Sequence, residues 1–384
     1  MKRILVAGAG PVGLTAALAL ARRGFAVTVL EAGDELAAES RASTFHPPTL
    51  EMLDELGVGA ELQALGLVSP TFAYRDRRAG LVAMLDLAVL AGDTRYPYRV
   101  QCEQSKLTPI LLGHLLRLPQ TEIRYGWPVA ELIMNLDGVV AISADGRTAE
   151  GDWLIGADGA HSAVRKATGV TFDGITYPER FLVASVDEEL TGWLDDLAAV
   201  NYVFDPVEWC VLLRTPDHWR VLLPTPVDTP DDEEHARLDS RLRGVVDPGR
   251  PWRIAHASMY RVHQRVATSF RTGRVLLAGD AAHVNNPLGG LGMNSGIHDA
   301  IAYASAIATG DDAAIWDTAA GRRRIALEYV QSVSHQNYER LRATDPDARA
   351  AHLDSLRAIA ADPAKARAAL LRSSMIASLR PVAA

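Results

Sequence analysis

The first residues able to do chemistry form a glycine-rich turn that follows a short apolar run. The turn reads Gly8-Ala9-Gly10-Pro11-Val12-Gly13. The first glycine permits a tight turn, the second lets backbone amides approach a pyrophosphate, and the third lets the next helix pack close to the sheet. The helix N-terminus adds roughly half a positive charge. Glu31, eighteen residues after Gly13, stands where a carboxylate can accept hydrogen bonds from ribose hydroxyls. The pattern predicts a dinucleotide but does not separate FAD from NAD, and the alternative is a turn that binds nothing.

A second motif spans residues 156–165, where an apolar strand runs into Asp158-Gly159. Ser162 is a good N-cap for the helix that continues toward Ala167. The functional interpretation is a cofactor contact by Asp158. The alternative is a strand–turn–helix junction in which this carboxylate only accepts hydrogen bonds from backbone amides.

A third motif spans residues 273–283, and a proline- and glycine-rich loop follows at 287–294. Asp280 at the predicted strand end can reach a ribityl hydroxyl. The loop presents backbone amides at the start of a helix that begins near Met293. These amides, with the helix dipole, would stabilise negative charge on the N1–C2=O edge of a reduced flavin. The alternative is an ordinary loop and helix start.

The three motifs, in this order and spacing, resemble the class A flavoprotein aromatic hydroxylases, the FAD-dependent monooxygenase family of para-hydroxybenzoate hydroxylase. The match covers residues 1–66, 100–170 and 268–310. The resemblance implies FAD as cofactor and NADPH or NADH as a transient reductant, since no second complete fingerprint is present. Reduced flavin then reacts with O2 to give a C4a-hydroperoxide, which hydroxylates an aromatic or phenol-like small molecule.

The resemblance also implies individual cofactor contacts. Arg41 with Ala42 would approach the pyrophosphate and flavin, Gln104 would begin the helix that holds the ribityl–phosphate region (Gln101 is the second choice), and Val129 would flank the adenine. Asp158 belongs to a motif credited with both FAD and nicotinamide binding. The implied cofactor-binding set is Gly8, Gly10, Pro11, Val12, Gly13, Glu31, Arg41, Gln104, Val129, Asp158, Asp280, Pro287, Gly292, Met293 and Asn294.

The elements that must position these motifs predict an α/β fold. Continuous apolar runs at 4–7 and 26–30 are typical of strands buried in a parallel sheet, whereas residues 175–268 hold short strands broken by prolines. We expect a Rossmann-like FAD-binding domain with a parallel sheet, interlaced with a mostly antiparallel β-sheet substrate domain and C-terminal helices. The expected boundaries are 1–71, 101–174 and 269–344 for FAD, 72–100 and 175–268 for the substrate, and 345–384 for the helices.

Catalytic candidates lie in the sheet-rich insert. A phenol is attacked best as its phenolate, and forming that anion at neutral pH costs about 4 kcal/mol when the pKa is near 10. A positioned base or cation would offset this. The candidates are Arg214, His218, Arg220 and Tyr260, with His256 and His263 as further members of the set. The alternative for each is an ordinary surface or core residue. His46, in an unusually ring-rich segment, is assigned packing or helix capping rather than acid–base chemistry.

Composition bounds the remaining classes. The 384 residues carry a net charge of −8, which argues against nucleic acid as the main partner. The presence of only two cysteines suits a reducing cytoplasm, and no metal site is expected. The sequence contains no run of 18 apolar residues, so we expect no membrane span. The expected partners are the substrate, O2 and NAD(P)H, with a homodimer admitted. Alternatives that stay open are Baeyer–Villiger oxidation, epoxidation, or a flavin-binding redox protein without oxygenase turnover. The Trp-x-Trp-x-Ile-Pro signature of flavin halogenases does not occur.

Overall fold

The nucleotide-binding half is built on a six-stranded sheet. The computed structural model describes residues 2–38 and 42–380. The strand order is β18-β19-β12-β1-β2-β8, and every neighbouring pair is parallel except the short β18 with β19. The apolar runs become this sheet because both of its faces are covered. Its strands are β1 (Arg3–Ala7), β2 (Ala26–Leu30), β8 (Thr121–Arg124), β12 (Trp153–Gly156), β18 (Arg271–Thr272) and β19 (Val275–Leu277).

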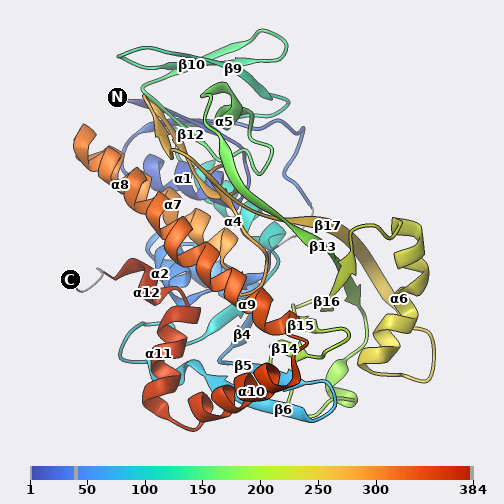
Figure 1. Cartoon of the computed structure of the whole chain (residues 1–384). Helices are drawn as coiled ribbons and strands as arrows, with labels where there is room; N and C mark the ends of the chain where they lie inside the picture. Colours follow the sequence, from blue (N-terminus) through green and yellow to red (C-terminus); the bar gives the residue numbers. More distant parts are fainter. Residues whose placement is uncertain (1, 39–41, 381–384) are drawn as a thin grey trace.

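Helices and a small sheet cover this core. α1 and α7 lie together against the parallel sheet, with α8 crossing outside them (Figure 1). The strands β9 (Val129–Met134), β10 (Val139–Ser143) and β11 (Thr148–Gly151) form an antiparallel sheet at one end. The helices of this half are α1 (Pro11–Arg22), α4 (Gln104–Leu115), α5 (Ala163–Ala167), α7 (Gly292–Thr309), α8 (Asp312–Ile325) and α9 (Ser332–Arg342), with a π-helical turn at Ala326–Gln331.

The other half is an eight-stranded sheet in the order β20-β17-β13-β16-β15-β14-β5-β6. All neighbours are antiparallel except β14 with β5, so the predicted α/β fold with a mostly antiparallel sheet is confirmed. The long strands β13 and β17 run from the nucleotide-binding half into this sheet (Figure 1). Its strands are β5 (Thr71–Asp76), β6 (Gly80–Asp86), β13 (Phe172–Val186), β14 (Val200–Phe204), β15 (Cys210–Arg214), β16 (Trp219–Pro226), β17 (Ile254–Ala267) and β20 (His283–Val284).

A three-stranded sheet links the two halves. Its order is β3-β7-β4, with β7 in the centre. The loop that begins at residue 42 leads into β3, and β7 leads into α4. The sheet therefore places both this loop and the start of α4 beside the space between the two halves. The elements are β3 (Thr44–Phe45), α2 (Pro47–Glu55), α3 (Gly59–Leu65), β4 (Leu67–Ser69) and β7 (Arg99–Gln101).

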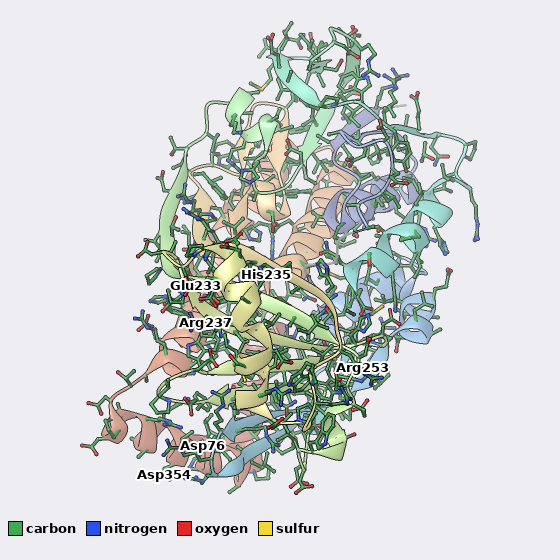
Figure 2. The ribbon with its side chains drawn as sticks, turned by 90° about the vertical axis from the view of Figure 1, so that its right-hand side faces the viewer. Asp76, Glu233, His235, Arg237, Arg253 and Asp354 are labelled. Carbon is green, nitrogen blue, oxygen red and sulfur yellow. The ribbon has the colours of Figure 1, made fainter. Side chains whose placement is uncertain are left out.

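The eight-stranded sheet is closed by helices at its outer side and its far end. Figure 2 shows α6 (Asp231–Val245), with Glu233, His235 and Arg237, on the outside of the molecule. The C-terminal helices α10 (Pro346–Ala360), α11 (Pro363–Ser373) and α12 (Ile376–Leu379) cover the β5–β6 end, where Leu353 and Leu370 join Phe72 in one core. The domain boundaries expected from the sequence stay a prediction. Among the helices described, none combines the length and apolarity that crossing a membrane requires.

Candidate active site

A cavity of about 500 Å³ lies between the parallel sheet and the eight-stranded sheet. All three motifs contribute to its lining, together with the loop after residue 42 and the face of the antiparallel sheet. Ligands of open α/β sheets bind in this position, outside the carboxyl ends of the parallel strands. The lining from the nucleotide-binding half includes Gly10, Pro11, Val12, Ala42, Gln104, Ala157, Gly159, Ala160, Asp280, Pro287, Gly292 and Met293.

The glycine turn has the geometry that a pyrophosphate needs. Gly8 has φ +100°, and a Cβ there would lie 2.5 Å from the Ala157 carbonyl oxygen. A Cβ on Gly13 would lie 2.0 Å from the Gly8 carbonyl oxygen, which shows how closely α1 packs on the turn. Gly10 is different, because no atom of the described residues lies within 4 Å of a Cβ placed there, and Gly10 lines the cavity. No side chain in the described part of the chain caps the start of α1, and Gly10 to Val12 at this start line the cavity, so its amides are open to the cavity.

Glu31 and Gln104 hold the loops around this turn. The Glu31 carboxylate accepts hydrogen bonds from the amides of Ala9 (2.6 Å) and Gly33 (2.8 Å). Gln104 begins α4, lines the cavity, and accepts a hydrogen bond from the Ala42 amide at 3.4 Å. Val129 starts β9 and is not among the cavity-lining residues. Arg41 lies outside the described residues.

The two aspartates of the later motifs have different surroundings. Asp280 lines the cavity from a 3-10 turn at Gly279–Ala281. Asp158 instead accepts hydrogen bonds from the Ser162 hydroxyl (2.5 Å) and the Val164 amide (3.0 Å), so its carboxylate caps α5 while its neighbours line the cavity. Arg165 ties the two motifs together by donating to the carbonyl oxygens of Ala281 (2.8 Å) and Ala160 (2.9 Å).

Buried hydrogen bonds fix the glycine-rich loop. The Asn294 side chain accepts from the His46 amide (3.0 Å) and donates to the carbonyl oxygens of Thr44 (2.8 Å) and Gly290 (2.7 Å). His46 Nε2 lies 2.9 Å from the Gly289 carbonyl oxygen. Burial, and next the charge of Arg99, hold the pKa of His46 well below its usual range. The neutral imidazole therefore donates to the loop, which agrees with the packing role expected for it. Among the residues that the structure describes, no side chain caps α7, and Gly292 and Met293 at its start line the cavity, so its amides are also open to the cavity.

Comparison with known proteins identifies the family. The family described as "FAD binding domain" matches residues 1–325. The chain is 37% identical to para-nitrophenol 4-monooxygenase of Pseudomonas sp. (strain WBC-3) over 358 residues, which are 89% of this chain and 88% of that protein. It is 36% identical to 6-hydroxy-3-succinoylpyridine 3-monooxygenase of Pseudomonas putida (strain DSM 28022 / S16), covering 88% and 89% of the two chains. The crystal structure of p-nitrophenol 4-monooxygenase from Pseudomonas putida DLL-E4 superposes with a TM-score of 0.93, at 33% identity and full coverage of both chains.

The chain belongs to this family of FAD-binding monooxygenases. The predicted class, cofactor and activity, an FAD-dependent monooxygenase of aromatic compounds, are thereby confirmed. Open space beside Gly10 and the uncapped amides of α1 and α7 fit a dinucleotide with an electron-rich ring.

The substrate side of the monooxygenase cavity is an apolar wall with few polar groups. The wall is formed by Val183, Val200, Val211, Leu213, Leu222 and Val262, interrupted by Arg99, Tyr202, Arg220, Tyr260, Arg261 and His263. Burial lowers the pKa of Arg220, with Glu103 and Tyr260 acting in the opposite direction. The sequence-based candidates Arg220, Tyr260 and His263 thus reach the cavity. Arg99 and Tyr202 were missed, because neither lies in a motif.

Three other candidates do not line the cavity. Arg214 points to Glu189 (Nη2 to Oε2, 3.4 Å) and His218 to Asp187 (Nδ1 to Oδ1, 3.1 Å). His256 is exposed on β17. The structure therefore brings together Arg220, Tyr260 and His263 and leaves Arg214, His218 and His256 apart from them.

A buried polar cluster lies behind the Asp280 turn. Asp299 is fully buried and accepts hydrogen bonds from the Gly279 amide (3.1 Å), from His283 Nε2 (2.9 Å) and from Arg322 Nε (2.6 Å). Burial alone would raise the pKa of the Asp299 carboxyl, but the charges of Arg322 and His283 outweigh it and lower that pKa. An ionised Asp299 thus anchors the turn that carries Asp280.

His298, next to this cluster, makes stability depend on pH. It lies 2.9 Å from the Thr49 hydroxyl, and burial, followed by the charge of Arg322, lowers its pKa to about 3. The unfolded chain takes up a proton near pH 6.5 and the folded chain does not, so stability falls as pH drops below 6.5. We expect His298→Gln to flatten this dependence by up to about 1.4 kcal/mol per pH unit. Urea unfolding of both proteins at pH 7.0, 6.0 and 5.0 measures it, and equal slopes would contradict the assignment.

Proposed function

We propose that the monooxygenase acts on a monocyclic phenol and places oxygen on the ring carbon opposite the hydroxyl, even where that carbon carries a substituent. The names of the two similar Pseudomonas enzymes support this. In para-nitrophenol the 4-position bears the nitro group, and in 6-hydroxy-3-succinoylpyridine the 3-position bears the succinoyl group and lies across the ring from the hydroxyl. Near-complete coverage of both chains at 36–37% identity favours a shared position of attack.

The observation that carries the proposal is the apolar cavity wall with its few cationic and phenolic groups. Valine and leucine side chains of β13 to β17 accept a ring, whereas Arg220 and Tyr260 can contact its polar substituents. A wall of this kind excludes water and fixes the ring plane, which an oxygen-transfer reaction requires. Arg214 and His218, which point away, are assigned no substrate contact.

Most of the proposed cofactor contacts line the cavity: Gly10 to Val12 with the α1 amides would hold the pyrophosphate, Gln104 and Asp280 the ribityl region, and Pro287 with Gly292 and Met293 the ring. Gly8, Gly13 and Glu31 do not line the cavity; the two glycines would shape the turn, and Glu31 would hold the ribose side. FAD, when bound and reduced by NAD(P)H, would supply the activation of O2, from which the inserted oxygen atom comes. The chain's own groups orient the phenol, keep water out and stabilise negative charge at the α7 N-terminus. A homodimer and a cytoplasmic location stay predictions.

Nitrite release tests the position of attack. With FAD-loaded enzyme, NAD(P)H and para-nitrophenol, attack at the nitro-bearing carbon expels nitrite and leaves a quinone. Attack at the carbon next to the hydroxyl-bearing carbon would instead retain the nitro group and give nitrocatechol. We expect about one nitrite per para-nitrophenol consumed, measured colorimetrically beside oxygen uptake. Consumption of para-nitrophenol with formation of nitrocatechol and no nitrite would overturn the proposed position.

meta-Nitrophenol is the matched control substrate. Its nitro group is not opposite the hydroxyl, so its turnover should release no nitrite. Failure of para-nitrophenol, hydroxypyridines and other simple phenols to stimulate NAD(P)H oxidation would reject the proposed substrate class altogether.

A further inference from the structure

Arg99 is a buried cation at the inner end of the active-site cavity. It lies in β7 and is 2% exposed. Its guanidinium carbon lies 4.3 Å from the centre of the Phe72 ring. Arg99 lines the main cavity and also a smaller one of about 30 Å³, which Tyr74, Tyr202 and Gly289 help to enclose. The guanidinium therefore lies between the main cavity, which has room for an aromatic ligand, and a second space that is too small for one.

The side chain of Arg99 has an incomplete set of partners. Nη2 donates to the Ser373 carbonyl oxygen at 3.3 Å, and Nε has no hydrogen-bond acceptor in the described part of the chain. No aspartate or glutamate among residues 2–38 and 42–380 forms an ion pair with it. Arg322, which is also buried, pairs with Asp299 at 2.6 Å. Buried charges are ordinarily paired, so an acceptor for Arg99 is expected from elsewhere.

The surrounding tyrosines do not neutralise this charge. Tyr74 and Tyr202 stack with ring centres 5.6 Å apart, and both lie close enough to Arg99 to influence its titration. Burial, and next the proximity of Tyr202, raise the pKa of Tyr74 to about 12. Burial also raises the pKa of Tyr202. Both phenols are therefore neutral at physiological pH, and the cavity around Arg99 keeps a net positive charge.

We propose that Arg99 pairs with the oxygen of the bound aromatic substrate and thereby binds the phenol as its phenolate. This inference rests on the proposed phenolic substrate class, but not on the position of oxygen attack. A phenolate supplies the missing negative charge, and its ring can lie in the main cavity beside Tyr202. The guanidinium would lower the pKa of the bound phenol because it favours the charged form. Arg99 would then be the cation that favours the phenolate, a role for which the sequence analysis proposed residues of β15 to β17.

Binding of para-nitrophenol to the oxidised, FAD-loaded enzyme tests the proposal without turnover. The ionised and neutral forms of this ligand absorb at different wavelengths, so difference spectra at several pH values give the pH midpoint of the bound ligand. In the wild type we expect that midpoint to lie below the one for free para-nitrophenol. In Arg99→Met it should rise by at least about one pH unit, a tenfold change in the ionisation constant. Arg99→Lys, which keeps the charge, should recover part of the shift.

Arg75 provides a matched control. It is 6% exposed, lies in β5 next to Tyr74, and donates to the Asp196 carbonyl oxygen at 2.9 Å, but it does not line either cavity. Arg75→Met should lower thermal stability and leave the ligand midpoint unchanged. If Arg99→Met does not fold, the pH midpoints of para-nitrophenol bound to Arg99→Lys and to the wild type test the proposal, because both proteins are expected to hold the ligand ionised.

Separate outcomes distinguish the proposals. A wild type that holds para-nitrophenol neutral, or does not bind it, overturns the role of Arg99, as does an Arg99→Met midpoint equal to that of the wild type. 4-Nitroanisole, which has the nitro group but no ionisable hydroxyl, should bind wild type and Arg99→Met equally. Selective loss of its binding in Arg99→Met would place the nitro group at Arg99 and overturn the phenolate pairing. Nitrite release reports the position of attack, independently of these spectra.

Discussion

Gly13→Ala is expected to yield a monooxygenase that retains little or no FAD. A Cβ at this position would lie 2.0 Å from the Gly8 carbonyl oxygen and 3.0 Å from its carbon, both backbone atoms that cannot rotate away. α1 must then move off the turn, which displaces the amides at its N-terminus from the pyrophosphate. Overpacking of this kind typically costs about 1–3 kcal/mol of stability. Flavin absorbance per polypeptide after reconstitution, with thermal unfolding, measures both effects.

Gly113→Ala is the control for this substitution. Gly113 lies inside α4, and a Cβ there meets no atom within 4 Å. Alanine is the better helix former by roughly 0.5–1 kcal/mol, so this variant should be as stable as the wild type or more so, with normal FAD content. Normal FAD binding by Gly13→Ala would mean that close packing of α1 on the turn is not required.

The cofactor half could be predicted because the features that dinucleotide binding requires are local in the sequence. A glycine that must allow close backbone approach, and an apolar strand before it, are visible within a few residues of sequence. The observed contacts of Gly8 and Gly13 show the same requirement in three dimensions. Asp158 illustrates the limit of such reasoning. Its motif reaches the cavity, but its carboxylate is bound to Ser162 and Val164, and the sequence alone could not choose between the two arrangements.

The substrate half could not be predicted to the same depth, because strand register decides which side chains face the cavity. In the β15–β16 hairpin, Leu213 pairs with Arg220, and both face the cavity. Arg214 pairs with Trp219 and takes the opposite face. Both faces of this sheet bury apolar residues. The sequence therefore shows no alternation of polar and apolar residues that would indicate which face lines the cavity. Arg99 comes from another sheet, and only the tertiary fold places it beside Tyr202.

The buried Asp299 cluster makes a second large effect expected. Asp299→Asn should lower the free energy of unfolding by about 3–5 kcal/mol, because Arg322 and His283 lose the buried charge that they surround. FAD affinity should fall as well, since the same carboxylate holds the Gly279 amide of the Asp280 turn. Urea unfolding and fluorescence titration of the apoprotein with FAD measure the two losses. Asp312→Asn is the control, because Asp312 is an exposed partner of Arg271, and its loss should change stability by less than about 1 kcal/mol.

The pH dependence of the Asp299→Asn effect gives a stricter test. A carboxyl whose folded pKa lies below its usual value of 3.8 contributes its full stabilisation above that value and loses it as pH falls further. The difference between wild type and Asp299→Asn should therefore stay constant from about pH 7 to pH 5. Asp299 raises the pKa of His298, so Asp299→Asn lowers that pKa further. His298 is therefore neutral in both folded proteins from pH 7 to pH 5, and its contribution cancels in the difference. A difference that grows steadily as the pH falls from 7 to 5 would mean that Asp299 takes up a proton in the folded enzyme, and the cluster would then hold the Asp280 turn by neutral hydrogen bonds.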